Sequence, residues 1–134
     1  MSTRELNWHT WLKEGDQFIH AATPKNPLKA FRPEIRYNLL SMAFESYVMA
    51  ILDFFNTLPD NHTFTDLFLA LDKVMLVDKT IKQRILNYEN IQSICSVEQY
   101  HTRPPEESEL DDLRDAIMHI KNRAYETCQP EPIL

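Results

Sequence analysis

Apolar residues recur every three or four positions along most of the chain, which is the spacing of one face of an α-helix. The first such stretch covers residues 3–22, and Gly15 lies within its apolar stripe. A missing side chain there would let another helix approach closely. Two prolines in residues 23–27 end this helix, because proline opposes its continuation. A second helix is predicted from Pro33, a residue suited to a first turn, to about Thr57.

The second predicted helix is apolar on almost every side from Ala43 onward. Such a helix is either central to a helical domain or part of an interface between subunits. Glu45 and Asp53 interrupt the apolar surface, and a buried carboxylate is costly when it has no partner. We therefore expect this helix to be the most buried, with each carboxylate paired or at an exposed edge.

Polar capping residues mark the next two helices. Thr63 or Thr65 is suited to begin a third helix that runs to about residue 77. Asp78 can cap a fourth helix, predicted over residues 79–97.

A last helix is predicted over residues 106–127, after a loop over residues 100–105 that contains two prolines. Its core stripe consists of Leu110, Leu113, Ile117, Ile120, Ala124 and Cys128. These patterns predict an all-α fold, an antiparallel up-and-down bundle of about five helices, four long and one shorter. We expect one domain over residues 1–129 and a flexible C-terminal tail over residues 130–134.

Composition narrows the functional classes. The chain of 134 residues has one glycine, which excludes glycine-rich loops of the kind that hold phosphates. Its net charge of -6 argues against non-specific DNA binding, which depends on a basic surplus. Two isolated cysteines, the lack of a secretory signal and the lack of a long apolar run predict a cytoplasmic protein without a membrane span.

Carboxylate and histidine residues lie one helical turn apart at three places. The pairs are Glu5 with His9, Asp16 with His20, and Asp115 with His119. Di-iron sites in helical bundles use Glu-x-x-His, a spacing that this chain does not contain, and no zinc-ligand spacing is present either. We interpret the pairs as surface ion pairs and predict no metal site and no cofactor.

Three segments resemble the HEPN superfamily of small helical domains. Residues 40–52 are similar to the family's helix with an Ala-x-Glu core, residues 65–71 to the helix that follows, and residues 100–105 to a loop with Arg, Tyr and Pro. The resemblance implies a non-enzymatic binding or interaction module for a nucleotide, RNA or a partner protein. Candidate binding residues in the loop are Tyr100, His101 and Arg103.

An alternative implied by the same resemblance is a metal-independent ribonuclease, the toxin of a toxin–antitoxin pair. Its family motif is Arg-x(4–6)-His, which Arg114 and His119 match as candidate catalytic residues. The arginine would stabilise phosphate charge and the histidine would transfer protons. Helical geometry, however, places His119 nearly opposite the core stripe. We favour the binding module and expect His119 on solvent, away from any groove.

A homodimer is also predicted. The second helix has more apolar surface than one chain is expected to bury, and the last helix has a second stripe beside its core stripe. A second subunit would bury both surfaces. That second stripe consists of Arg114, Met118, Lys121 and Tyr125.

Overall fold

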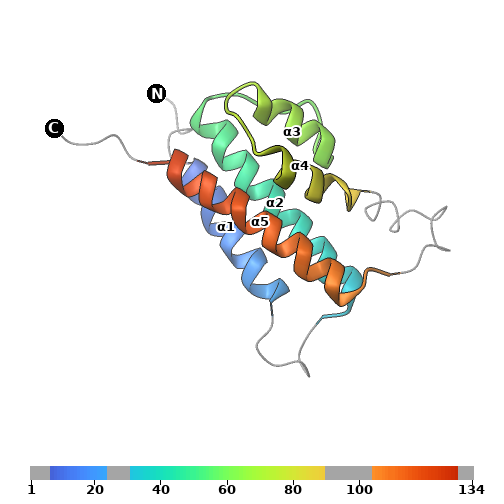
Figure 1. Cartoon of the computed structure of the whole chain (residues 1–134). Helices are drawn as coiled ribbons and strands as arrows, with labels where there is room; N and C mark the ends of the chain where they lie inside the picture. Colours follow the sequence, from blue (N-terminus) through green and yellow to red (C-terminus); the bar gives the residue numbers. More distant parts are fainter. Residues whose placement is uncertain (1–6, 24–30, 90–103, 130–134) are drawn as a thin grey trace.

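The computed structural model describes residues 7–23, 31–89 and 104–129 (Figure 1). Within these residues it contains α-helices and no β-strand, so the predicted all-α class is confirmed. The helices are α1 (Asn7–Ala22), α2 (Pro33–Phe54), α3 (Phe64–Asp72), α4 (Lys79–Leu86) and α5 (Glu107–Thr127). No helix in this part of the chain combines the length and the apolar character needed to cross a membrane.

Helix α2 lies at the centre of the molecule, with α1, α3 and α5 packed against it (Figure 1). Its buried residues are Tyr37, Leu40, Ala43, Phe44, Ser46, Tyr47, Val48, Met49, Ala50, Ile51, Leu52 and Asp53. No other helix in the described ranges buries as many residues, which confirms the expectation for this helix. The apolar second half of α2 is therefore covered largely within the chain, by its neighbours on three sides.

Helices α2 and α5 run in the same direction. Arg36 near the start of α2 forms an ion pair with Glu107 at the start of α5. Toward the other end, the Cys128 thiol donates to the carbonyl of Ala50 at 3.4 Å. Helix α1 runs the opposite way, since the carbonyl of Ala22 at its end accepts from Arg36 at 3.3 Å. The strictly alternating order of an up-and-down bundle is therefore not confirmed.

Gly15 is the point at which α1 and α2 meet most closely. A Cβ atom built at Gly15 would lie 2.6 Å from Cε1 and 2.8 Å from Cζ of Tyr47. Real Cβ atoms essentially never approach another atom so closely, so the Tyr47 ring occupies the space that a side chain would need. The predicted close approach of a second helix at Gly15 is confirmed.

Side-chain caps start α3 and α4. The Thr63 hydroxyl accepts from the backbone N–H of Asp66 at 3.1 Å, so Thr63 rather than Thr65 is the N-cap of α3. Asp78 accepts from the backbone N–H groups of Thr80 at 2.8 Å and Ile81 at 3.1 Å. The predicted cap of α4 is confirmed.

Helices α3 and α4 are shorter than predicted. Helix α3 ends at Asp72 instead of residue 77, because the chain turns there: the N–H of Val74 bonds to the carbonyl of Leu71, three residues back. Helix α4 ends at Leu86 instead of residue 97, and residues 90–97 lie outside the described ranges. In the ranges that the structure describes, three helices are long and two are short, so the prediction of four long helices and one short one was wrong there.

The two carboxylates in the apolar half of α2, Glu45 and Asp53, have partners, as expected. Asp53 accepts from the indole N–H of Trp11 at 3.1 Å. Glu45 is paired with Nδ1 of His62 at 2.5 Å. Each contact joins α2 to a segment outside it and removes the penalty of an isolated carboxylate.

Candidate functional site

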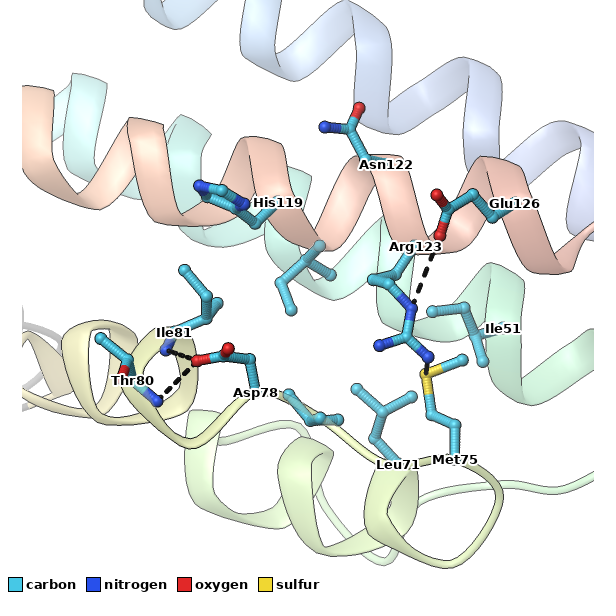
Figure 2. A pocket seen from close by; sticks show the side chains of 12 residues that line it. Ile51, Leu71, Met75, Asp78, Thr80, Ile81, His119, Asn122, Arg123 and Glu126 are labelled. Atoms are coloured by element: carbon cyan, nitrogen blue, oxygen red, sulfur yellow. Dashed lines mark hydrogen bonds and ion pairs between the residues drawn. The ribbon is translucent and has the colours of Figure 1, made fainter.

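A cavity of about 520 Å³ lies between α5, the start of α4 and the turn that joins α3 to α4 (Figure 2). Its lining residues are Ile51, Leu71, Met75, Val77, Asp78, Thr80, Ile81, His119, Ile120, Asn122, Arg123 and Glu126. They come from four helices and one turn, so the cavity exists only once the helices have packed. Its volume is within the range of about 300–1,000 Å³ that is usual for sites of small organic ligands.

The floor of the cavity is apolar. Ile51 and Leu71 are completely buried beneath it, and Ile81 and Ile120 are almost so. Half-buried Val77 belongs to the turn that forms the opposite wall. An apolar floor of this kind gains affinity by removing apolar ligand surface from water.

Arg123 holds one wall of the cavity in place. Its Nη1 donates to the carbonyl of Leu76 at 3.0 Å, and its Nη2 contacts Sδ of Met75 at 3.7 Å. Its Nε lies 3.7 Å from a carboxylate oxygen of Glu126 (Figure 2). One guanidinium thus fixes the turn between α3 and α4 against α5.

His119 and Asn122 form the polar edge of the cavity on α5 (Figure 2). Both residues are exposed, and so are Asp78 and Thr80 on the α4 side. His119 is therefore on solvent, as expected, but the expectation that it lies away from any groove was wrong. Helical periodicity placed His119 opposite the core stripe correctly and gave no sign that the α3–α4 turn approaches that side.

Arg114 and His119 are not brought together within one chain. Arg114 is half-buried and is not among the residues that line the cavity. Five residues at about 100° each separate the two directions by roughly 140° around the helix axis. The other candidates, Tyr100, His101 and Arg103, lie outside the described residues.

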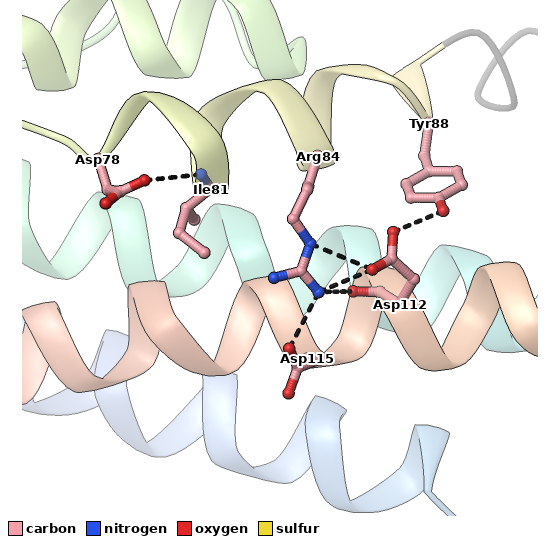
Figure 3. A network of polar contacts seen from close by, with 6 residues as sticks. All are labelled: Asp78, Ile81, Arg84, Tyr88, Asp112 and Asp115. Atoms are coloured by element: carbon pink, nitrogen blue, oxygen red, sulfur yellow. Dashed lines mark hydrogen bonds and ion pairs between the residues drawn. The ribbon is translucent and has the colours of Figure 1, made fainter.

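A polar network joins the end of α4 to the first half of α5 (Figure 3). Arg84 donates to Asp112 at 2.7 Å and to Asp115 at 2.9 Å, and the Tyr88 hydroxyl donates to Asp112 at 2.6 Å. The bond from Tyr88 outweighs burial and, with Arg84, lowers the pKa of the Asp112 carboxyl. Burial and Asp112 raise the pKa of Tyr88 to about 12. These contacts clamp α4 to α5 and keep Asp112 ionised.

A second network joins α1, α2 and α5 around Asp16. The Tyr47 hydroxyl donates to Asp16 at 2.6 Å, the Tyr125 hydroxyl donates to the same carboxylate, and Lys121 lies 3.4 Å from it. Burial acts to raise the pKa of Asp16, but these partners outweigh it and the pKa is lowered. Burial and Asp16 raise the pKa of Tyr125 to about 12.

These networks correct two expectations drawn from helical spacing. Asp16 and Asp115 are paired with Lys121 and Arg84, instead of with the histidines four residues later. Lys121 and Tyr125 were predicted to belong to a stripe that a second subunit covers. They contact α1 of their own chain, so that part of the stripe gives no reason for a dimer.

Among the described residues, no group of three or more His, Cys, Asp or Glu side chains is arranged to hold a metal ion. The candidate site is therefore the amphipathic cavity, whose chemistry is supplied by carboxylate, guanidinium, imidazole and amide groups.

Comparison with known protein families, with curated proteins and with solved structures gives no match. The resemblance to HEPN domains stays a prediction. The cavity itself was not found from the sequence, because its walls come from segments as far apart as Ile51 and Glu126.

Proposed function

We propose that the chain is a non-enzymatic binding module that takes a small organic ligand in the cavity between α5 and the α3–α4 turn. The observation that supports this is the cavity's composition, an apolar floor with a few polar groups at its edge, which is typical of ligand sites. The HEPN-like resemblance supports the same class of function. A cytoplasmic location is part of this proposal.

The polar edge favours binding over catalysis. A nucleophile or general base needs a neighbouring group within hydrogen-bond reach that activates or orients it. His119 is the one histidine lining the cavity, and no such bond to another cavity residue is seen in the described chain. The groups at the edge are suited to hold and orient a ligand.

The ligand classes that the resemblance names make different demands on this cavity. A nucleotide would place its base against the apolar floor and leave its phosphates outside. RNA or a partner protein would insert a single base or side chain. In each case the cavity would bury one apolar group of limited size.

A cavity-filling substitution tests the proposal. Val77→Phe adds volume inside the cavity, and Leu69→Phe makes the same type of change at an exposed position of α3 outside it. The probes are adenosine and hexan-1-ol, titrated into protein with ¹³C-labelled methyl groups. We expect shifts at the methyl groups of Ile81 and Ile120 in the native protein and the Leu69→Phe control, and none in Val77→Phe. Absence of binding by both probes in the native protein would refute the proposal.

The ribonuclease remains the second candidate, because His119 lines a cavity. A site that also uses Arg114 would need a second subunit, since the two side chains point in directions roughly 140° apart. RNA cleavage that is lost in His119→Ala but retained in His20→Ala would establish this candidate. His20 is the matched control, an exposed histidine on α1.

A homodimer through α2 is also proposed. Ile35 and Met42 are 40% and 44% exposed, and their spacing of seven residues places them on one side of α2; Phe31, 49% exposed, lies just before the helix. Light scattering should give twice the chain mass of 15.8 kDa. Ile35→Glu should give the mass of one chain, whereas Leu69→Glu, at an exposed aliphatic residue of α3, should not. A native protein that scatters as one chain would rule the dimer out.

A further inference from the structure

The charged groups around the cavity differ in whether they are already engaged by the protein. Four ionisable side chains line it: Asp78, His119, Arg123 and Glu126. Of these, two are carboxylates and one is a permanently charged guanidinium. Which of them faces an incoming ligand decides what charge that ligand can carry.

Arg123 is the group that would attract an anion, and three of its five N–H groups face protein atoms. One Nη donates to the carbonyl of Leu76, the other contacts the sulfur of Met75, and Nε lies beside Glu126. These contacts hold the guanidinium on the cavity wall, and the neighbouring Glu126 carboxylate balances its charge.

The backbone N–H groups at the start of α4 are not available to bind an anion either. Backbone N–H groups at a helix start attract negative charge, but the N–H groups of Thr80 and Ile81 both donate to Oδ1 of Asp78. The helix start therefore presents a carboxylate to the cavity. Glu126, the ion-pair partner of Arg123, adds a second carboxylate on the α5 side, so the lining holds two carboxylates against one guanidinium (Figure 2).

We infer that the cavity takes an apolar ligand that ends in a protonated amine, and that it excludes the same ligand ending in a carboxylate or phosphate. This inference rests on the proposed function, because it assigns the ligand class of the same cavity. The apolar part packs on Ile120 and Leu71, and the amine lies toward Asp78 and Glu126. One unit charge at contact distance changes an affinity by about fivefold even at the dielectric constant of water.

Three probes with one chain length separate the effect of charge from the effect of the cavity. Hexylamine, hexan-1-ol and hexanoate share the apolar part and differ in the charge of the end group. Their affinities are measured by the same methyl shifts, at low salt and near neutral pH. We expect hexylamine to bind at least about fivefold more tightly than hexanoate, with the alcohol between them, and added salt to reduce the difference.

The double variant Asp78→Asn/Glu126→Gln removes both carboxylates, and asparagine keeps the capping ability of Asp78. We expect the ratio of the hexylamine affinity to the hexanoate affinity to fall to one or below, because Arg123 then keeps its positive charge without a carboxylate beside it. Asp60→Asn/Asp111→Asn makes the same change in net charge at exposed positions away from the cavity and should keep the native ratio.

Two results would overturn the inference and leave the proposed function standing. In the first, hexanoate binds the native protein as tightly as hexylamine does. In the second, Asp78→Asn/Glu126→Gln prefers hexylamine over hexanoate as strongly as the native protein does. If hexan-1-ol and both charged probes fail to bind the native protein, the inference and the proposed binding site fail together.

Discussion

Replacing Gly15 by alanine should destabilise the protein, although alanine is the better helix former. The new Cβ would lie 2.6 Å from the Tyr47 ring, so the ring or α1 must move. Forcing extra atoms into a packed core costs roughly 1–3 kcal/mol. Displacing the Tyr47 hydroxyl from the Asp16 carboxylate costs about 1.5 kcal/mol more. The higher helix propensity of alanine offsets about 1 kcal/mol. We expect a net loss of roughly 2–3 kcal/mol in the free energy of unfolding.

Urea denaturation of four proteins measures this effect and its cause. They are the native chain, Gly15→Ala, Tyr47→Leu and the double variant. Tyr47→Leu removes the ring, so Gly15→Ala in that background should be neutral or stabilising by up to about 1 kcal/mol. Gln17 is an exposed residue of the same helix, so the difference in stability between Gln17→Gly and Gln17→Ala measures the effect of helix propensity alone. A native-background Gly15→Ala that is more stable than the parent would refute the argument.

Three further predictions concern the polar networks and the buried thiol. The lowered pKa of Asp16 contributes stability that is present above its ordinary pKa of 3.8 and is lost as the pH falls through the folded-state value. Asp16→Asn should therefore lose less stability than the native protein between about pH 6 and about pH 3, and an equal loss in urea titrations would contradict this. Arg84→Lys should lower the free energy of unfolding nearly as much as Arg84→Met, by about 1 kcal/mol, because lysine cannot reproduce the bonds to Asp112. Thermal unfolding of both variants is the measurement, and full stability of Arg84→Lys would count against the network's geometry. Burial raises the pKa of Cys128 to about 12, so its thiol is both protonated and covered in the folded protein. In the Cys95→Ser variant, where Cys128 is the one remaining thiol, the folded protein should therefore react with a thiol reagent only as fast as it unfolds.

The sequence patterns correctly predicted those features of the helices that depend only on residues within or next to the helix itself. Helix α2 and the core stripe of α5 follow from apolar spacing alone, and the cap of α4 follows from one aspartate in front of it. In these places the local pattern and the packing agree, so the pattern was sufficient.

The shortened α3 was not predictable in this way. Apolar Val74, Met75 and Val77 continue the spacing of α3, but the chain turns after Asp72. Arg123 holds that turn through the carbonyl of Leu76, across 47 residues of sequence. A pattern read over one or two helical turns contains no information about such a partner.

The cavity was missed for the same reason. Its polar edge on α5 is one solvent-exposed side of a helix, which ordinarily has no function. Only the position of the α3–α4 turn makes His119 and Asn122 part of a site, and that position depends on packing between distant segments.

The parallel pairing of α2 with α5 has a consequence for synthesis on the ribosome. The ion pair between Arg36 and Glu107 joins residues 71 positions apart, so the face of α2 that α5 covers cannot be covered until the residues of α5 have been made. Helices α1 and α2 can associate much earlier, because they are neighbours in sequence. A nascent chain that ends before residue 107 would therefore expose one apolar side of α2. Such exposed surface is the kind that chaperones bind and that promotes aggregation.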